Sequence, residues 1–311
     1  MIDPGTTSRR FEIIEETLHD ENNMVTVSDL CRLSGVSRSG YYRWLGAADK
    51  RRQREQQDRE DFERILEAYK YRGRAKGARG IHMRLLHLED PVIMNVKKIR
   101  RLMKKYHLTC PIRKPNPYRQ MMRAIQTSYT AENLVDRRFT EAGPGVVLLT
   151  DITYIPDEDG FCYLSTVIDA VTRQCLSYVL SDSLKEDFVL ETIDQLMRDH
   201  GISLHAKTLI HSDQGAHYTS VRFRELLKDK GLRQSMSRRG NCWDNAPQES
   251  FFGHMKDEVT IDRSLSFEET KAEIDDWIDY YNNDRYQWSL AKLSPNEYAE
   301  YLTTGIYPLK I

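Results

Sequence analysis

Between residues 146 and 237, strand-like apolar segments alternate with amphipathic helix patterns, and this order restricts the possible folds more than any other feature of the sequence. The first three segments are rich in β-branched and aromatic residues, are joined by short turns, and cover 146–155, 161–171 and 175–180. A helix pattern over 185–200 follows them. Strands and helices in this order predict an α/β fold with a mixed sheet flanked by helices.

Two further segments extend the predicted sheet to five strands. Lys207–Asp213 has the pattern of a short buried strand, a helix pattern covers 221–230, and 232–237 has the pattern of an edge strand. We therefore expect one α/β domain over 141–265, followed by a helical tail over 266–311.

Three carboxylates occupy positions where such a fold displays functional groups. Asp151 lies inside the first strand among apolar neighbours, where an unpaired charge costs several kcal/mol. Asp213 ends the fourth strand, and Glu249 follows Pro247, which marks the start of a helix. Taken singly, Asp213 has the alternative role of a turn cap, and Glu249 that of a charge complementing the helix dipole.

Together, the three carboxylates have the chemistry of a metal centre. Mg²⁺ prefers oxygen ligands, and two such ions can promote phosphoryl transfer without a nucleophilic side chain. This chemistry makes Asp151, Asp213 and Glu249 candidate catalytic residues and candidate ligands of two Mg²⁺ ions, for which Mn²⁺ can substitute. Lys256 follows Glu249 by seven residues on the same helical face and is a candidate contact to a DNA phosphate, the alternative being an ordinary exposed lysine.

The charge is divided unequally between the two halves of the chain. Residues 1–140 contain 29 basic and 18 acidic side chains, whereas 141–311 contain 17 basic and 29 acidic ones. Such asymmetry indicates a basic arm for a polyanion and a separate acidic module. The five cysteines are scattered without a CxxC pair, which argues against a disulfide framework or a cysteine zinc site, and no apolar run is long enough to cross a membrane.

Residues 1–48 contain the pattern of a helix-turn-helix unit. We expect Ser28 to cap a helix that ends at Leu33, Gly35 to supply the turn, and Ser37 to cap a second helix. An ordinary helical hairpin is the alternative. The candidate DNA contacts on the second helix are Ser37, Arg38 and Arg43.

A second helical unit is expected over 49–110, with helices at 78–88 and 96–106. No acidic residue occurs between Asp90 and Glu132, a region with ten lysines and arginines, which favours a phosphate-binding surface over an incidental basic run. The candidate contacts on the second of these helices are Lys97, Lys98, Arg100, Arg101 and Lys104. Residues 111–140 contain three prolines and are predicted to form an extended basic linker, with a short helix around 118–125.

Three blocks of the acidic half resemble the catalytic blocks of the IS3-family insertion-sequence transposases, which belong with the retroviral-type integrases. They are Thr-Asp-Ile-Thr-Tyr at 150–154, His-Ser-Asp-Gln-Gly-Ala-His-Tyr-Thr-Ser at 211–220, and 235–252, which contains Asn-Ala-Pro-Gln-Glu-Ser-Phe-Phe. Thirty-five residues separate Asp213 from Glu249, as in that family. Gln214 and His217 depart from the family pattern, as does the absence of a tryptophan just before Asp151, but none of these changes alters the three carboxylates.

The resemblance implies an RNase H-like core with Asp151, Asp213 and Glu249 as its metal-binding triad and Lys256 as a DNA contact. It further implies metal-dependent cleavage of the ends of an insertion element, followed by attack of the 3′-OH on another phosphodiester. The implied partners are the terminal inverted repeats and target DNA, further copies of the chain on that DNA, and the helix-turn-helix and leucine-zipper product of an upstream reading frame, or a fusion with it. The implied location is the prokaryotic cytoplasm, at the nucleoid.

Two other functions are compatible with parts of the sequence. A non-catalytic, transposon-derived DNA-binding regulator would use the basic half alone, but it would have no need of three carboxylates. A nuclease of the RNase H type acting on RNA–DNA hybrids would have no need of two helical DNA-binding units.

Overall fold

The computed structural model describes residues 6–21, 23–73, 76–110, 143–201, 204–237, 245–259 and 264–309. The chain divides into two compact units, Met1–Leu66 and Glu67–Ile311. The expected linker over 111–140, with its short helix at 118–125, lies outside the described residues. Within them, no helix has the length and apolar character needed to span a membrane.

The first unit is a helical cluster. Its helices are α1 (Thr7–Leu18), α2 (Val27–Leu33), α3 (Arg38–Gly46) and the start of α4 (Ala48–Lys70). Helix α1 was not among the predicted elements, and its buried Phe11 and Ile14 pack with Cys31 of α2 and Tyr41 of α3. The predicted helix-turn-helix pair is therefore completed by a third helix, which supplies the apolar surface that the two short helices need.

Of the two helix caps predicted in this unit, one is observed and the other is not. Ser37 caps α3 as predicted, since its Oγ accepts a hydrogen bond from the Gly40 backbone N–H at 3.1 Å. The predicted Ser28 cap of α2 is wrong: the helix begins at Val27, and Thr26 is its cap, accepting from the Asp29 N–H. Thr26 stands three residues before Asp29, whose carboxylate its hydroxyl also contacts, and this earlier start adds two residues to the helix.

The second unit begins with a small helical part. After the short helix η1 (Tyr71–Gly73) come α5 (Ala78–Leu86) and α6 (Val96–Lys105), close to the predicted ranges. Asn95 caps α6 by accepting from the Lys97 N–H at 2.8 Å. The buried side chains of both helices are mostly apolar, and the lysines and arginines of α6 are exposed except for Lys98, which is half-buried.

A mixed five-stranded sheet follows, as predicted. Its strands are β1 (Val147–Asp157), β2 (Gly160–Asp169), β3 (Cys175–Ser181), β4 (Leu209–Ser212) and β5 (Arg233–Met236). They are arranged in the order β3-β2-β1-β4-β5. The first three pair antiparallel through hairpins, whereas β4 pairs parallel with both β1 and β5, which makes β5 the expected edge strand.

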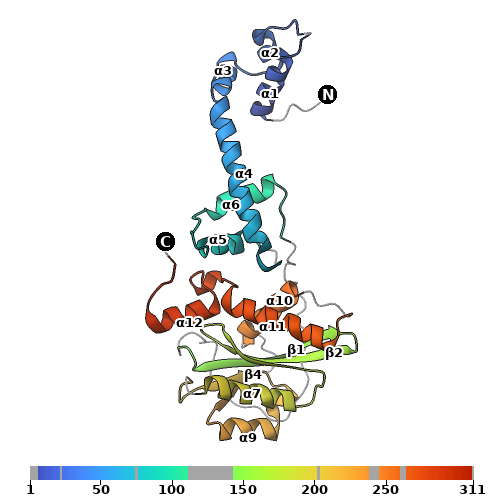
Figure 1. Ribbon diagram of the computed structural model, residues 1–311, viewed down its shortest axis with the longest axis vertical. Helices are drawn as coiled ribbons and strands as arrows, with labels where there is room; N and C mark the ends of the chain where they lie inside the picture. The colour runs from blue at the N-terminus through green and yellow to red at the C-terminus, as the bar shows by residue number, and fades with distance from the viewer. Residues whose placement is uncertain are drawn as a thin grey trace. The chain divides into compact units, whose positions relative to one another are not determined.

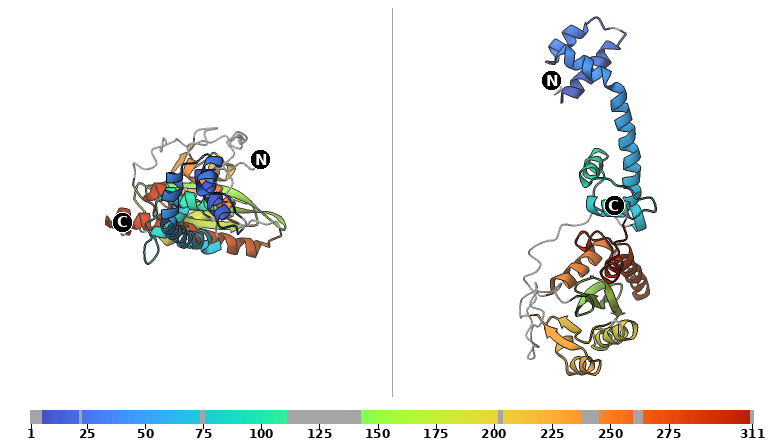
Figure 2. Two further views of the ribbon diagram at one scale, coloured as in Figure 1. Left: turned by 90° about the horizontal axis from the view of Figure 1, so that it is seen from above. Right: turned by 90° about the vertical axis from the view of Figure 1, so that its left-hand side faces the viewer.

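Helices cover both faces of this sheet (Figure 1). One face packs against α7 (Asp187–His200) and α9 (Val221–Asp229), and the other against α10 (Ala246–Glu258) and α11 (Phe267–Asn283). Figure 2 shows the same layering from the side. The short helix α8 (Ala216–Thr219) follows β4, and η4 (Trp288–Leu290) and α12 (Pro295–Thr304) complete the C-terminal tail.

Candidate active site and DNA-binding surfaces

Asp151 and Asp213 are brought together by the parallel pairing of β1 with β4. The register pairs Leu149 with His211, so its continuation by two residues places Asp213 beside Asp151. Adjacent strands lie about 4.8 Å apart, so the two side chains emerge as neighbours. Asp151 is half-buried and Asp213, just beyond the end of β4, is exposed.

The alternation of side chains along each strand determines which face of the sheet carries the two carboxylates. Leu149 of β1 and Leu209 of β4 belong to the apolar cluster under α10 and α11, whereas Leu148 and Ile210 belong to the cluster under α7 and α9. Because side chains two residues apart share a face, Asp151 and Asp213 emerge on the α10 side.

The third carboxylate is carried on the helix that covers this face. Glu249 is exposed in the first turn of α10, and its neighbour Gln248 is fully buried and donates from Nε2 to the Oγ1 of Thr166. Thr166 of β2 is the residue paired with Asp151 in the sheet. The start of α10 is thus anchored at the level of Asp151, on the face shared by both aspartates.

Tyr218 lies near both aspartates but packs on the opposite face of the sheet, in the cluster under α7 and α9. This residue of α8 is 2% exposed, and its hydroxyl lies 3.4 Å from the Oγ1 of Thr150. Burial and the negative charges of Asp151 and Asp213 raise the pKa of the Tyr218 hydroxyl well above its usual value. Both carboxylates therefore act on one buried phenol, which stays protonated.

Local hydrogen bonds orient the two aspartates. Asp151 accepts from the Ile152 N–H at 2.8 Å, and Asp213 accepts from the Gly215 N–H at 2.8 Å. A side chain added at Gly215 would come within 2.8 Å of the Asp213 carboxylate, so this tight approach requires glycine.

The donor chemistry of this site suits a hard divalent cation. In the part of the chain that the structure describes, no three His, Cys, Asp or Glu side chains are close enough together to hold a metal ion. The three carboxylates nevertheless supply oxygen ligands from two strands and a helix over one face, and Mg²⁺ takes such ligands. The chemistry of these side chains therefore suits Mg²⁺, and Asp151, Asp213 and Glu249 are the groups that would hold it, although in this structure these three described residues do not form a metal-binding cluster.

The two histidines near Asp213 are used structurally. His211 is fully buried, and its ring nitrogens contact the hydroxyls of Ser235 at 2.9 Å and Ser237 at 3.1 Å. His217 contacts the Leu184 carbonyl oxygen through Nε2 at 2.8 Å. Lys256 is exposed on α10, as its place on the Glu249 helix predicts.

The candidate DNA contacts occupy the surfaces of two helices. On α3, Arg38 and Arg43 are exposed, and Ser37 is exposed while it caps the helix. A cavity of about 650 Å³ beside α3 is lined by Arg43 together with Arg10 and Arg51, two cations that the sequence analysis did not select. On α6, Lys98 is half-buried, whereas the other four candidates are exposed: Lys97, Arg100, Arg101 and Lys104.

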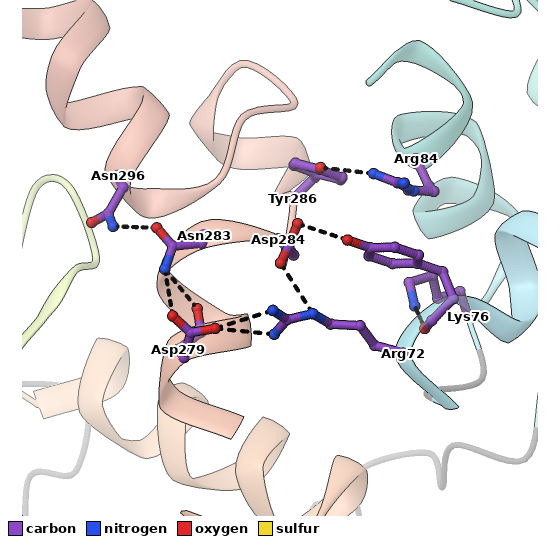
Figure 3. A network of polar contacts seen from close by, with 9 residues as sticks. Arg72, Lys76, Arg84, Asp279, Asn283, Asp284, Tyr286 and Asn296 are labelled. Atoms are coloured by element: carbon purple, nitrogen blue, oxygen red, sulfur yellow. Dashed lines mark hydrogen bonds and ion pairs between the residues drawn. The ribbon is translucent and has the colours of Figure 1, made fainter. Parts of the chain in front are cut away.

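A polar joint connects the helical part of the second unit to the C-terminal helices (Figure 3). Arg72 contacts Asp279 at 3.1 Å and Asp284 at 3.3 Å, and the Tyr71 hydroxyl donates to Asp284 at 3.1 Å. Arg84 donates to the Tyr286 hydroxyl at 3.4 Å. Two acidic residues of the second half, Asp279 and Asp284, therefore neutralise Arg72 of the first half.

The same joint continues around His87. Its ring stacks on Tyr286 with centroids 3.5 Å apart, and its Nε2 lies 3.1 Å from Glu297 of α12. The contact of His87 holds the pKa of Glu297 below its usual value against the opposing effect of burial. Sequence reasoning missed these residues because no local pattern marks a contact between segments some two hundred positions apart.

Three aromatic residues of α11 pack against the core. Trp277 is fully buried, and Tyr280 and Tyr281 are nearly so. Trp288 of η4 is instead 47% exposed, with Lys292 over its ring.

Comparisons with known proteins agree with this architecture. Two family models described as "Integrase core domain" match residues 141–242 and 230–295, and one described as "HTH-like domain" matches 55–116. The chain is 32% identical over 284 residues to the "Putative transposase InsK for insertion sequence element IS150" of Escherichia coli (strain K12), covering 91% of this chain and 96% of that protein. It is 29% identical over 278 residues to the "Insertion element IS600 uncharacterized 31 kDa protein" of Shigella sonnei, covering 87% of this chain and 97% of that one.

Among solved structures, one similar chain comes from the simian T-cell lymphotropic virus intasome in complex with PP2A regulatory subunit B56 gamma. It has a TM-score of 0.44 and 14% identity, and 70% of each chain is covered. Another is the HTLV-2 integrase catalytic core domain in complex with magnesium, in its trimeric form. It has a TM-score of 0.39 and 14% identity, and 50% of this chain and 97% of that one are covered.

Proposed function

The chain belongs to the IS3-family insertion-element transposases with an integrase core domain, and from that premise we propose that it cleaves the ends of an insertion element and joins them to target DNA. The observation that carries the proposal is the sharing of one sheet face by Asp151 and Asp213, with the Glu249 helix anchored over that face through Gln248 and Thr166. An element end would be held with its scissile phosphate at these three carboxylates.

The proposed roles follow from the chemistry of each residue. Asp151, Asp213 and Glu249 would hold Mg²⁺, or Mn²⁺ in its place, at two positions. When bound, the two ions supply the polarisation that makes an oxygen nucleophile reactive and stabilise the leaving oxygen. The chain's own contribution is to hold the three carboxylates on one rigid face and to orient the scissile phosphate, with Lys256 as a phosphate contact on the Glu249 helix.

DNA binding is assigned to the helical parts of the chain. We propose that α3 inserts into a groove through Arg38 and Arg43, near Ser37, and that the exposed cations of α6 contact phosphates. The proposed domains are 1–48 and 49–110 for DNA binding, 111–140 as linker, 141–265 as catalytic core and 266–311 as C-terminal tail. Assembly of several copies on DNA, cooperation with an upstream-frame product and action at the prokaryotic nucleoid belong to the same proposal.

The test uses the purified full-length chain and a duplex carrying a terminal repeat of the element. Wild-type protein should cleave the repeat and join it to target DNA only with Mg²⁺ or Mn²⁺, and Asp213→Asn and Glu249→Gln should each abolish both steps while DNA binding is retained. Lys228→Gln, which changes an exposed residue of α9, serves as the matched control. Equal activity of the carboxylate variants would refute the assignment. Binding without cleavage by every protein, wild type included, also when the upstream-frame product is added, would favour the non-catalytic regulator.

A further inference from the structure

The residue before Glu249 is placed in an unusual environment. Gln248 is fully buried at the start of α10, although glutamine is mostly found on protein surfaces. Its Nε2 donates to the Oγ1 of Thr166, which is also fully buried. Its Oε1 is buried without a hydrogen-bond partner among the described residues.

The amide of Gln248 is therefore only half satisfied. A threonine hydroxyl can accept from the amide nitrogen or donate to the amide oxygen, so one contact leaves one of the two amide atoms unpaired in either orientation. A buried polar atom without a partner lowers the stability of the fold. An apolar side chain of the same size would avoid that cost, so stability alone does not account for glutamine here.

The position of Thr166 links this amide to the carboxylates. Thr166 faces Asp151 directly across the β1–β2 pair, and side chains opposite each other in an antiparallel pair have Cβ atoms about 4.5–5.5 Å apart. Thr166 lies on the α10 side of the sheet, as do Cys162 and Leu164 in the same strand. The bond from Gln248 to Thr166 thus joins the first turn of α10 to the strand position next to Asp151.

Apolar contacts fix the rest of α10, and the Gln248–Thr166 bond adds a polar contact at its first turn. Phe251, Phe252 and Met255 are buried in the core cluster under α10 and α11. At the helix start, the cap residue Asn245 makes no side-chain cap bond. Glu249 belongs to the turn that Gln248 anchors, so this bond contributes to the orientation of Glu249.

We infer that Gln248 is a positioning residue which, through Thr166, holds the first turn of α10 at the level of Asp151 and sets the place from which Glu249 joins the two aspartates in binding a divalent cation. This inference rests on the proposed function of the triad. It predicts that loss of the Gln248–Thr166 bond lowers the affinity for the cation more than it lowers the stability of the fold.

The experiment measures Mn²⁺ binding and thermal unfolding of the full-length chain without DNA. Mn²⁺ affinity is determined by the electron paramagnetic resonance signal of the free ion, and the melting temperature by calorimetry in EDTA. Gln248→Met and Thr166→Val remove the bond with little change of volume, and Thr166→Ser keeps the hydroxyl as the matched control.

Gln248→Met and Thr166→Val are each expected to weaken Mn²⁺ binding by about 10–100-fold, the usual effect of losing a group that orients a metal ligand. The melting temperature of Gln248→Met should be unchanged or raised, and Thr166→Ser should bind Mn²⁺ like the wild type. The double variant should bind no more weakly than the weaker single variant, because both changes remove one interaction.

Unchanged Mn²⁺ affinity in the two bond-removing variants would overturn the inference. So would a loss of melting temperature that parallels the loss of affinity, or a failure of Gln248→Met to fold, since either result would make the bond a structural contact. The variant Asp213→Asn distinguishes failure of the inference about Gln248 from failure of the proposed function. If Asp213→Asn also keeps full affinity, the triad assignment is wrong; if it alone loses affinity, only the role of Gln248 is wrong.

Discussion

Arg285 forms a bidentate ion pair with Glu258, with Nε and Nη2 of the guanidinium 2.9–3.0 Å from the carboxylate oxygens. Their side chains are only 15% and 9% exposed, and Trp277 donates to the same carboxylate at 3.2 Å. Glu258 is the last residue of α10 and Arg285 follows α11, so the pair fastens the end of the Glu249 helix to the C-terminal tail. Burial by itself raises the pKa of Glu258, but the charge and hydrogen bonds of Arg285 hold it below its usual value.

Removal of one partner of this pair should be strongly destabilising. Arg285→Met leaves the Glu258 carboxylate buried without its counter-ion and is expected to cost about 3–5 kcal/mol of unfolding free energy. The double variant Arg285→Met/Glu258→Leu should recover most of that loss, because no buried charge remains. Urea unfolding followed by circular dichroism measures both. A loss below about 1 kcal/mol in Arg285→Met would contradict a buried, tightly coupled pair.

His254 should make stability depend on pH in a defined window. Burial and the charge of Arg285 lower the pKa of His254 from 6.5 to about 4, despite the opposing charges of Glu258 and Asp257. The unfolded chain binds a proton at this residue below about pH 6.5, whereas the folded chain does so only near pH 4, so stability is lost as pH falls through that window. The loss should be on the order of 2–3 kcal/mol.

The variant His254→Gln tests this expectation. Unfolding free energies measured between pH 7 and pH 4 should fall less steeply for His254→Gln than for the wild type, whereas His107→Gln, at an exposed histidine, should follow the wild type. Parallel curves for His254→Gln and the wild type would show that this residue does not titrate differently in the folded state.

The joint between Arg72 and the C-terminal helices should be sensitive to salt. Its charges are partly exposed, with side chains 32% exposed for Arg72 and 56% for Asp279, so the contact is worth about 1 kcal/mol at most. Arg72→Gln should therefore speed amide hydrogen exchange in α5 by up to about fivefold, and high salt should produce a similar increase in the wild type. Arg100→Gln, on the exposed surface of α6, is the control. Identical exchange in Arg72→Gln and the wild type would mean that the joint does not restrain α5.

The cations of α6 should determine how DNA binding responds to salt. Removal of three exposed charges by Lys97→Gln, Arg100→Gln and Lys104→Gln should weaken binding to any duplex. It should also reduce the slope of log K against log[salt] by about 0.9 for each lost phosphate contact. Fluorescence anisotropy across a salt series measures the slope. An unchanged slope would exclude α6 as a phosphate-binding surface.

Local patterns predicted most of the second unit. The strands and helices of the sheet region follow from apolar periodicity. In the first unit, the sequence also predicted that Ser37 caps a helix, because Ser37 stands just before α3. The misplaced cap at Ser28 arose because two hydroxyl residues stand close together, and only the folded chain selects Thr26. Helix α1 was not predicted, because its apolar residues become informative only when they meet Cys31 and Tyr41.

The sequence by itself determined the α/β order, the place of Asp151 inside a buried strand and the spacing of the two later carboxylates, because strand alternation and helix signals are local. Only the tertiary structure decided that Asp151 and Asp213 share the face covered by α10, that Gln248 reaches Thr166, and that Arg72 meets Asp279. Those relationships depend on strand pairing and helix packing between residues far apart in the chain. The composition gave the opposite charges of the two halves, but only the folded chain brings Arg72 of the first half into contact with Asp284 of the second.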